Sequence, residues 1–267
     1  PTPFVFALLL FLFLLNFTMQ PSARVRATDS PVIGKMLSLA KNAKPGLVSL
    51  AQGVVFWDPP SSAIEHAKDA MSDQNTHMYC PTSGLPELIE GLKEKLAREN
   101  ALKNVEVIVT SGANQAFTNV VLSLCDSTDG GVLFPPYYFN HIMAFQMTGV
   151  SNIVLGEREA ETYAPDVGWI DKALSSQSIK MVVITNPCNP TGTVLSRERL
   201  EAISAICKKH GCWLVCDNTY EYFIYDNDEV AHSCIEAPHV VNIYSFSKGK
   251  LQNPSFFHLL VSFTNCT

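Results

Sequence analysis

The chain has 267 residues, of which 47% are apolar and 16% charged, and its 19 Lys and Arg against 25 Asp and Glu give a net charge of −6. The apolar content excludes intrinsic disorder, and the length suits one large domain, or a domain and a half, with a substantial core. The acidic balance, with no block of Lys or Arg, argues against a nucleic-acid-binding surface.

The chain begins at Pro1 and continues into an apolar run at Phe4–Leu15. This run is shorter than the roughly 20 residues of a membrane-spanning helix, and no basic segment precedes it as in a secretory signal. We therefore expect residues 1–18 to be a hydrophobic leader that is not native, with Met19 as the start and a cytoplasmic location. The alternative is a secretory or membrane-targeted protein, with a signal cleaved near Ala27.

Helices are predicted at Ser61–Ser72 and Leu85–Glu99, where apolar residues recur at helical spacing. From Val105 onward, short apolar strands alternate with helices. The predicted strands are Val105–Thr110, Val132–Phe134, Ile153–Leu155, Met181–Thr185, Trp213–Cys216 and Val240–Tyr244, and the predicted helices are Ala113–Leu124, Tyr138–Met147, Val167–Ser175 and Arg199–His210. This alternation predicts an α/β fold, a mostly parallel sheet with helices on both faces. Ligands of such sheets bind beyond the carboxyl ends of the strands.

Polar residues follow the first and fourth predicted strands. The first strand leads through Ser111, Gly112, Ala113 and Asn114 into a helix, and a glycine there lets the backbone approach a phosphate. An ordinary turn is the alternative for this segment alone. The fourth strand is followed by NPCNPTG at residues 186–192, whose prolines hold the asparagine side chains on a rigid loop.

The fifth and sixth strands end in a carboxylate and an amine. Asp217 closes a very apolar run, where a carboxylate is costly unless it has a cation or a donated proton as its partner. Lys248 closes the string SFSK, and a desolvated lysine can serve as a nucleophilic amine, although a solvated surface lysine is the ordinary alternative. Because all four groups stand at strand ends of one sheet, they indicate a single site.

The eight cysteines include no CxxC pair. The nearest approach to a metal cluster is Cys207, His210, Cys212 and Cys216, whose spacing differs from that of zinc sites and which straddle a helix end and a buried strand. We expect thiols in the core of a protein from a reducing compartment, and no metal site.

The strings NPCNPTG, DNTY and SFSK resemble those of fold-type I pyridoxal-phosphate enzymes of the class I/II aminotransferase family. Longer strings resemble plant-type aromatic and methionine aminotransferases: SLAQGVVFW, SGANQAF, PYYFN, MAFQMTGV and GCWLVCDNTYEYF. The resemblance runs from about Pro31 to Lys248. It implies an N-terminal segment at 19–48, an incomplete pyridoxal-phosphate-binding large domain at 49–248 and a divergent tail at 249–267.

The resemblance also implies a role for each matched residue. Lys248 would bind pyridoxal phosphate covalently and move the proton of the reaction, while Asp217 would pair with the protonated pyridine nitrogen. Tyr220 and Asn189 would hydrogen-bond the phenolic oxygen, and Tyr138 would stack on the ring. Lys248, Asp217 and Tyr220 are thus the expected catalytic residues.

Other matched residues would hold the phosphate and the substrate. The phosphate would be bound by the backbone N–H groups of Gly112, Ala113 and Asn114 and by the hydroxyl of Ser245. Tyr79 matches a tyrosine that reaches the phosphate of the neighbouring subunit, which implies a homodimer. Gly53 and Asn189 would lie on the substrate side. For Tyr79 and Tyr138 the alternative is an aromatic residue of the core.

The chain departs from the family pattern after Lys248. Phe256 stands where the family has a phosphate-binding arginine, and the small C-terminal domain, with its carboxylate-binding arginine, has no counterpart in the sequence. In the family, the strand after the lysine lies antiparallel between the first and sixth strands. We therefore expect two unpaired interior edges, unless the apolar run Phe256–Phe263 fills the gap.

The function expected from the resemblance is transfer of the amino group of an aromatic amino acid or methionine to a 2-oxo acid, impaired by C-terminal truncation. One alternative is a non-catalytic, truncated fragment that binds pyridoxal phosphate. Another is a lyase of the same fold, such as an aminocyclopropane-carboxylate synthase. The expected partners are an amino acid, a 2-oxo acid and a second copy of the chain, with no nucleic acid.

Overall fold

The computed structural model describes residues 20–43, 46–48, 53, 58–225 and 231–248, together with the backbone of 260–264. The predicted leader at 1–18, most of the string SLAQGVVFW and position Phe256 lie outside the described residues.

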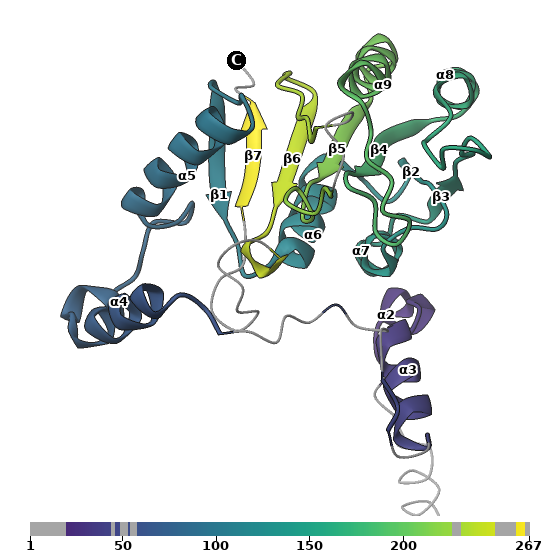
Figure 1. Cartoon of the computed structure of the whole chain (residues 1–267). Helices are drawn as coiled ribbons and strands as arrows, with labels where there is room; N and C mark the ends of the chain where they lie inside the picture. Colours follow the sequence, from purple (N-terminus) through teal and green to yellow (C-terminus); the bar gives the residue numbers. More distant parts are fainter. Residues whose placement is uncertain are drawn as a thin grey trace, which may run out of the picture.

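A seven-stranded sheet in the order β1-β7-β6-β5-β4-β2-β3 forms the centre of the described domain (Figure 1). Its strands are β1 (Val105–Val109), β2 (Gly130–Leu133), β3 (Asn152–Leu155), β4 (Ile179–Thr185), β5 (Trp213–Asp217), β6 (Val240–Tyr244) and β7 (Leu260–Thr264). The pairs β3–β2, β2–β4, β4–β5 and β5–β6 are parallel, which confirms the predicted α/β class.

Strand β7 occupies the position where the sequence left two interior edges unpaired. It runs antiparallel to both of its neighbours, with Val105 opposite Thr264 on one side and Tyr244 opposite Leu260 on the other. The expectation of unpaired edges is therefore wrong. The backbone of residues 260–264 satisfies the hydrogen-bonding groups of β1 and β6, and this strand overlaps the apolar run that was the alternative.

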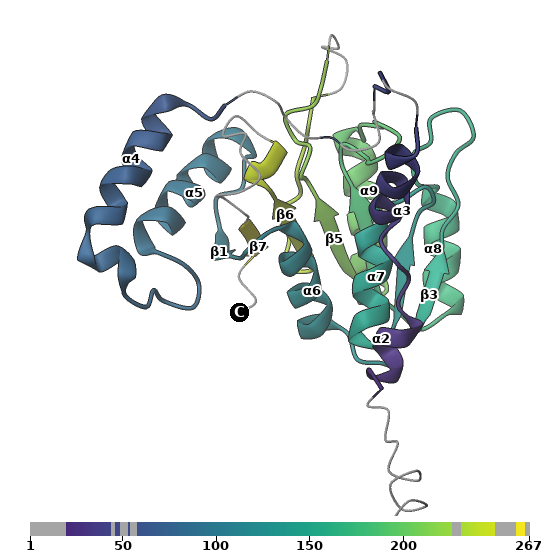
Figure 2. The ribbon, with the colours of Figure 1, turned by 90° about the horizontal axis from the view of Figure 1, so that it is seen from below.

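Helices cover both faces of the sheet. The described helices are α2 (Ala23–Ala27), α3 (Val32–Lys41), α4 (Ser61–Ser72), α5 (Pro86–Glu99), α6 (Ala113–Leu124), α7 (Phe139–Thr148), α8 (Val167–Ser176) and α9 (Arg197–Lys209), with short 3₁₀ helices η1 (Gln74–His77) and η2 (Phe246–Lys248). Helices α6 and α7 lie on one face, and α8 and α9 lie on the other (Figure 2). None of the described helices is both long and apolar enough to span a membrane.

The predicted elements are confirmed with small shifts at their ends. β2 begins at Gly130 instead of Val132, and Tyr138 is the N-cap of α7 instead of its first residue. Helices α2 and α3 were not predicted from the sequence. Asp29, which lies between them, forms two hydrogen bonds with Gln146 of α7. Its backbone N–H donates to Oε1 of Gln146 at 3.0 Å, and its carboxylate accepts from Nε2 at 2.9 Å.

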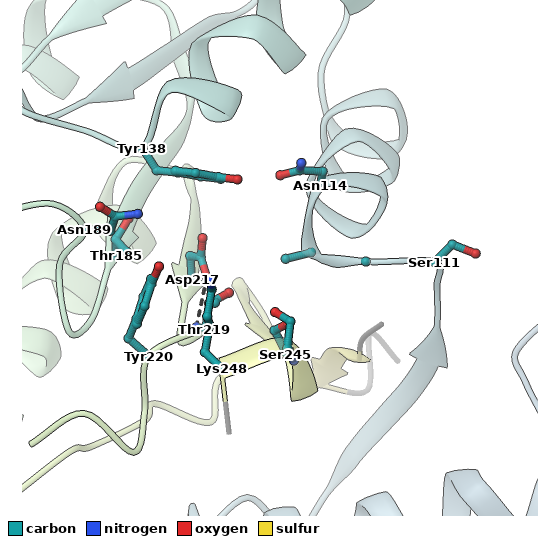
Figure 3. Close-up of a pocket in the computed structure, with 13 residues that line it drawn as sticks. Ser111, Asn114, Tyr138, Thr185, Asn189, Asp217, Thr219, Tyr220, Ser245 and Lys248 are labelled. Atoms are coloured by element: carbon teal, nitrogen blue, oxygen red, sulfur yellow. Dashed lines mark hydrogen bonds between the residues drawn. The ribbon is translucent and has the colours of Figure 1, made fainter. Parts of the chain in front are cut away.

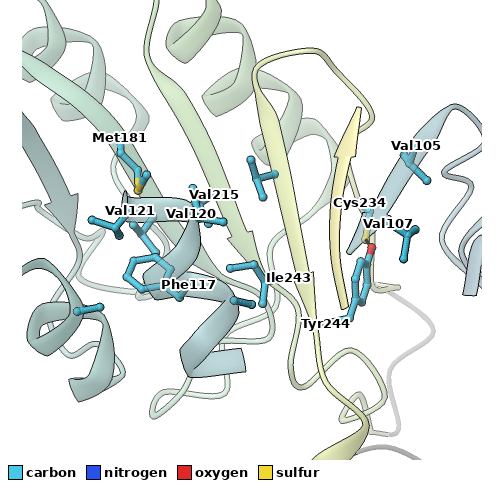
Figure 4. Packing of buried hydrophobic residues seen from close by; sticks show 14 of the residues in the cluster. Val105, Val107, Phe117, Val120, Val121, Met181, Val215, Cys234, Ile243 and Tyr244 are labelled. Atoms are coloured by element: carbon cyan, nitrogen blue, oxygen red, sulfur yellow. Dashed lines mark hydrogen bonds between the residues drawn. The ribbon is translucent and has the colours of Figure 1, made fainter. Parts of the chain in front are cut away.

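Alternating side chains of the central strands build two hydrophobic clusters. In β4, Met181 and Val183 face the cluster with α6 and α7, which Figure 4 shows around Phe117, whereas Val182 and Ile184 face the cluster with α8 and α9. Such a sheet has both faces covered, so polar groups can reach solvent or ligand only at its edges and strand ends.

The cysteines of the suspected cluster lie in the core, as predicted. Cys207, Cys212 and Cys216 are all buried in the cluster with α8 and α9. His210 instead contacts Asp171, with its Nε2 2.6 Å from Oδ1.

Candidate active site

A cavity of about 340 Å³ lies at the carboxyl ends of β4, β5 and β6, beside the start of α6 (Figure 3). Every predicted site residue except Gly53 and Tyr79 lines this cavity. The lining residues are Ser111, Gly112, Ala113, Asn114, Tyr138, Thr185, Asn189, Asp217, Thr219, Tyr220, Ser245, Ser247 and Lys248. The sequence did not single out Thr185, Thr219 or Ser247 as site residues.

Asp217 is the last residue of β5, and its carboxylate is buried at the floor of this cavity. Its Oδ2 lies 3.0 Å from Nε2 of His141, and its Oδ1 accepts a hydrogen bond from the backbone N–H of Thr219 at 3.0 Å. Burial by itself raises the pKa of Asp217, but the His141 and Thr219 contacts outweigh it and hold the pKa below its usual value of 3.8. The carboxylate is therefore ionised at neutral pH.

His141 is a site residue that the sequence prediction missed. It lies in the first turn of α7, three residues after the N-cap Tyr138, whose carbonyl accepts a hydrogen bond from the backbone N–H of His141 at 3.0 Å. Its ring packs against Phe117, with centroids 4.4 Å apart, and edge-on against Tyr138 at 5.4 Å. The three-residue spacing between an aromatic residue and a histidine was the feature of the sequence that could have pointed to His141. It indicates a site residue only when α7 is known to lie beside the end of β5.

One end of the cavity is suited to an anion. Gly112, with φ 115°, is the N-cap of α6, and no side chain caps this helix among the described residues, so the N–H groups of its first turn are available to a ligand. Ser245 and Ser247 complete this end, with their hydroxyl oxygens 2.6 Å apart. The side chain of Ser111 points away from the other labelled residues (Figure 3).

Lys248 brings an amine to the same cavity. It ends the short helix η2, and its Nζ donates a hydrogen bond to the carbonyl of Gly53. Burial lowers the pKa of Lys248 below its usual 10.5. A larger fraction of the side chain is consequently the neutral, nucleophilic amine than for a solvated lysine.

Two tyrosines and an asparagine form the opposite wall. Burial raises the pKa of both Tyr138 and Tyr220, so their hydroxyls remain protonated at neutral pH. Asn189 lies on a loop that is closed by hydrogen bonds of Cys188, whose N–H donates to Thr193 (2.9 Å) and whose carbonyl accepts from Gly192 (2.7 Å).

A second, wider cavity of about 750 Å³ adjoins the first and shares Tyr138, Asn189 and Tyr220 with it. Gly53, which the sequence analysis expected on the substrate side, lines this second cavity. Its described lining residues carry no charged side chain and include several aromatic ones: Tyr137, Tyr138, Phe139, Tyr220, Phe223 and Tyr225.

A half-buried ion pair fastens the loop that carries Tyr220. Its neighbour Glu221 accepts hydrogen bonds from Lys95 of α5 at 2.6 and 2.7 Å, and Asn100 donates to the same carboxylate at 2.8 Å. Lys95 also lies over the ring of Tyr244, 4.8 Å from its centroid, at the end of β6. Helix α5 is thus joined to two of the strand ends that supply the cavity.

The residues present fit pyridoxal phosphate. The start of α6 and the serine hydroxyls suit a phosphate, the buried carboxylate suits a protonated ring nitrogen, and the partly buried amine suits an aldehyde. The cavity volume also lies within the usual range for sites of small ligands. Tyr79 lies outside the cavity with a fully exposed side chain.

Comparison with known proteins gives a consistent result. The family described as aminotransferase class I and II matches residues 45–249. An aromatic aminotransferase of Arabidopsis thaliana is 49% identical over 230 residues, which cover 85% of this chain and 57% of that protein. An aspartate/prephenate aminotransferase of Thermus thermophilus is 31% identical over 232 residues, which cover 86% of this chain and 58% of that protein.

Solved structures show the same similarity. A single mutant of the aspartate aminotransferase of Thermus thermophilus has a TM-score of 0.79 at 26% identity and is matched over 92% of this chain and 65% of its own. The structure of a Pyrococcus protein has a TM-score of 0.82 at 26% identity and is matched over 90% of this chain and 62% of its own. The chain therefore spans less than two thirds of the length of these proteins.

The low pKa of Asp217 predicts a specific dependence of stability on acid. Its ionised form contributes stability above the unfolded-state pKa, near 3.8, and this contribution is lost as the pH falls through the lower folded-state pKa. Urea unfolding at a series of acidic pH values should show a steeper loss of unfolding free energy for the native chain than for Asp217→Asn. Asp69→Asn, at an exposed position of α4, should retain the native slope, and equal slopes for all three proteins would contradict the assignment.

Proposed function

Because the chain belongs to the class I and II aminotransferase family, whose members depend on pyridoxal phosphate, we propose that it binds this cofactor and transfers the amino group of an aromatic amino acid or methionine to a 2-oxo acid. The observation that carries the proposal is the placement of Asp217, Lys248 and the start of α6 around one cavity. These groups match the nitrogen, aldehyde and phosphate of the cofactor.

Pyridoxal phosphate supplies an aldehyde that condenses with amines and a ring that withdraws electrons from the substrate Cα. Asp217, kept ionised by His141 and Thr219, would hold the proton on the ring nitrogen. Lys248 would bind the cofactor and, once released by the substrate amine, move a proton from Cα with its Nζ.

The remaining side chains would orient the cofactor. Tyr220, whose hydroxyl keeps its proton, and the amide of Asn189 would donate hydrogen bonds to the phenolic oxygen. Tyr138 would cover the ring face, and it is itself held by His141 at its edge and by a hydrogen bond from Asn140 to its hydroxyl at 2.7 Å. The first turn of α6 with Ser245 would bind the phosphate.

The aromatic wall of the second cavity supports an aromatic amino donor. Its described lining carries no cationic side chain that could pair with the second carboxylate of a dicarboxylic substrate, whereas its rings can pack against another ring. The name of the Arabidopsis relative, an aromatic aminotransferase, agrees with this substrate class.

Titration of the full chain with pyridoxal phosphate tests cofactor binding. We expect an absorption band of the lysine-bound cofactor, and reduction with borohydride should attach the cofactor to the peptide that contains Lys248. Lys248→Ala should abolish both signals, while Lys208→Ala, at an exposed position of α9, should preserve them. A band and adduct that persist in Lys248→Ala would refute the assigned role, and their absence from the native chain would refute cofactor binding.

Substitution of Phe223 by alanine tests the substrate class. Loss of its ring from the second cavity should weaken the binding of L-phenylalanine about tenfold, as measured by the change in absorption of the bound cofactor. Binding of L-aspartate should not change, because no ring packs on Phe223 in that case. Leu122→Ala, which removes an exposed side chain of α6, is the control. Equal effects on both amino acids would contradict the aromatic assignment.

We further propose that the active form is a homodimer in which Tyr79 of each subunit reaches the phosphate site of the other. The full exposure of Tyr79, together with the exposure of the preceding Met78 and of Met71 in α4, supports this proposal. A mixture of Tyr79→Ala and Lys248→Ala chains should regain cofactor sites that bind tightly, because one site of each mixed dimer then has both native residues. If mixing restores no such site, the proposed role of Tyr79 is refuted.

A further inference from the structure

Arg158 makes an unusual set of contacts behind the wall of the cavity. Its Nε donates to the carbonyl of Pro135 at 2.9 Å, and its Nη2 donates to the carbonyls of Phe134 at 2.9 Å and Pro136 at 3.3 Å. Its Nη1 donates to the carbonyl of Tyr163. The same Nη2 also lies 3.3 Å from Sγ of Cys188. One guanidinium thereby joins three successive carbonyls of one segment to the thiol of another.

The two segments joined by Arg158 lead directly to site residues. The carbonyls belong to the turn that follows β2 and enters α7, where Tyr138 is the N-cap. The thiol belongs to Cys188, which precedes Asn189 and closes the loop that presents it. Tyr138 and Asn189 both line the cofactor cavity, although Arg158 itself does not.

Arg158 is held in place from the other side. It lies on a hairpin in which the N–H of Glu159 donates to the carbonyl of Ala164 at 2.9 Å. Arg199 of α9 anchors this hairpin through a bidentate contact with the carboxylate of Glu159, at 2.6 and 3.0 Å. A chain of contacts therefore runs from α9 to the wall of the cavity.

We propose that Arg158 is a positioning residue, which fixes Tyr138 and Asn189 against the ring of the cofactor by tying the 134–136 turn to the Cys188 loop. The physical reason is that this turn has left the sheet, so its carbonyls find no partner in a strand ladder. A planar guanidinium, with five N–H donors, can satisfy several of them at once. The role toward the cofactor rests on the proposed function, whereas the tie between the two segments does not.

The tie can be tested in the full chain without any cofactor. Cys188 is buried, whereas Cys80 is exposed, so alkylation by iodoacetamide, mapped by peptide mass, should modify Cys80 rapidly and Cys188 slowly. Arg158→Met should raise the rate at Cys188 about tenfold by allowing the loop to open, and leave the rate at Cys80 unchanged. Arg197→Met, which breaks an exposed pair with Glu201 on α9, should change neither rate.

The positioning role is tested by two ligands that use different parts of the cavity. Arg158→Met should weaken the binding of pyridoxal phosphate about tenfold. This is the lower end of the effect seen in metal sites when a residue that orients a ligand side chain is removed. Binding of inorganic phosphate, which uses only α6 and the serines, should be unchanged. A general loss of structure would weaken both ligands equally, and that result, or no change in either, would overturn the proposal.

A second variant covers the case in which Arg158→Met does not fold. Arg158→Lys keeps the charge but cannot reach all the carbonyls at once, and this variant should fold. Its alkylation rate at Cys188 should be higher than that of the native chain, and its affinity for pyridoxal phosphate should be lower, with both changes smaller than those expected for Arg158→Met. Native behaviour of Arg158→Lys in both measurements would overturn the proposal. If the native chain binds no pyridoxal phosphate, the proposed function fails, and Cys188 reactivity still decides whether Arg158 ties the two segments.

Discussion

A carboxylate that is buried away from water needs hydrogen-bond donors from the protein. Asp217 is such a carboxylate, so the elements around the carboxyl end of β5 have to supply these donors. The donor from the helix layer is His141, so α7 must lie where its first turn reaches the end of β5. The same turn then places Tyr138 over the cavity. The donor from the backbone is the N–H of Thr219, and this contact fixes the chain after β5, so that Tyr220 also lines the cavity. One buried charge thereby relates the end of β5, the start of α7 and the segment that carries Tyr220 to one another.

Residues whose role depends on local pattern could be predicted from the sequence, and residues that act across elements could not. Asp217 was identifiable because it ends an apolar strand, Lys248 because it closes the string SFSK just after one, and Gly112 because it joins a strand to a helix. His141 lies within a helix with no polar pattern around it, and Arg158 contacts backbone carbonyls, which leave no trace in side-chain identity. Strand β7 entered the sequence analysis only as the alternative in which the run Phe256–Phe263 fills the gap. Its partner β1 is remote in sequence, and the chain departs from the family pattern after Lys248.

Two different kinds of contact support the site from outside. Lys95 and Glu221 form an ion pair of low exposure, in which Asn100 satisfies a further oxygen, as a buried pair requires. Arg158 instead uses its charge on neutral carbonyls, which suits a turn that contains two prolines and few side-chain acceptors. The first contact holds the Tyr220 loop to α5, and the second holds the Tyr138 turn to the Asn189 loop. The mobile connections of an α/β domain are thus fixed at the positions where a ligand needs them rigid.

The central place of β7 has a consequence for how the chain reaches this structure. Pairing Val105 with Thr264 closes a very long loop, and such non-local contacts form late and slow folding. During synthesis the strands β1 to β6 emerge before β7 is made, so β1 and β6 expose adjoining edges while the chain grows. Nascent chains in this interval are open to edge-to-edge association with one another, and protection by a chaperone is most valuable there. The addition of β7 therefore converts an aggregation-prone intermediate into a continuous sheet.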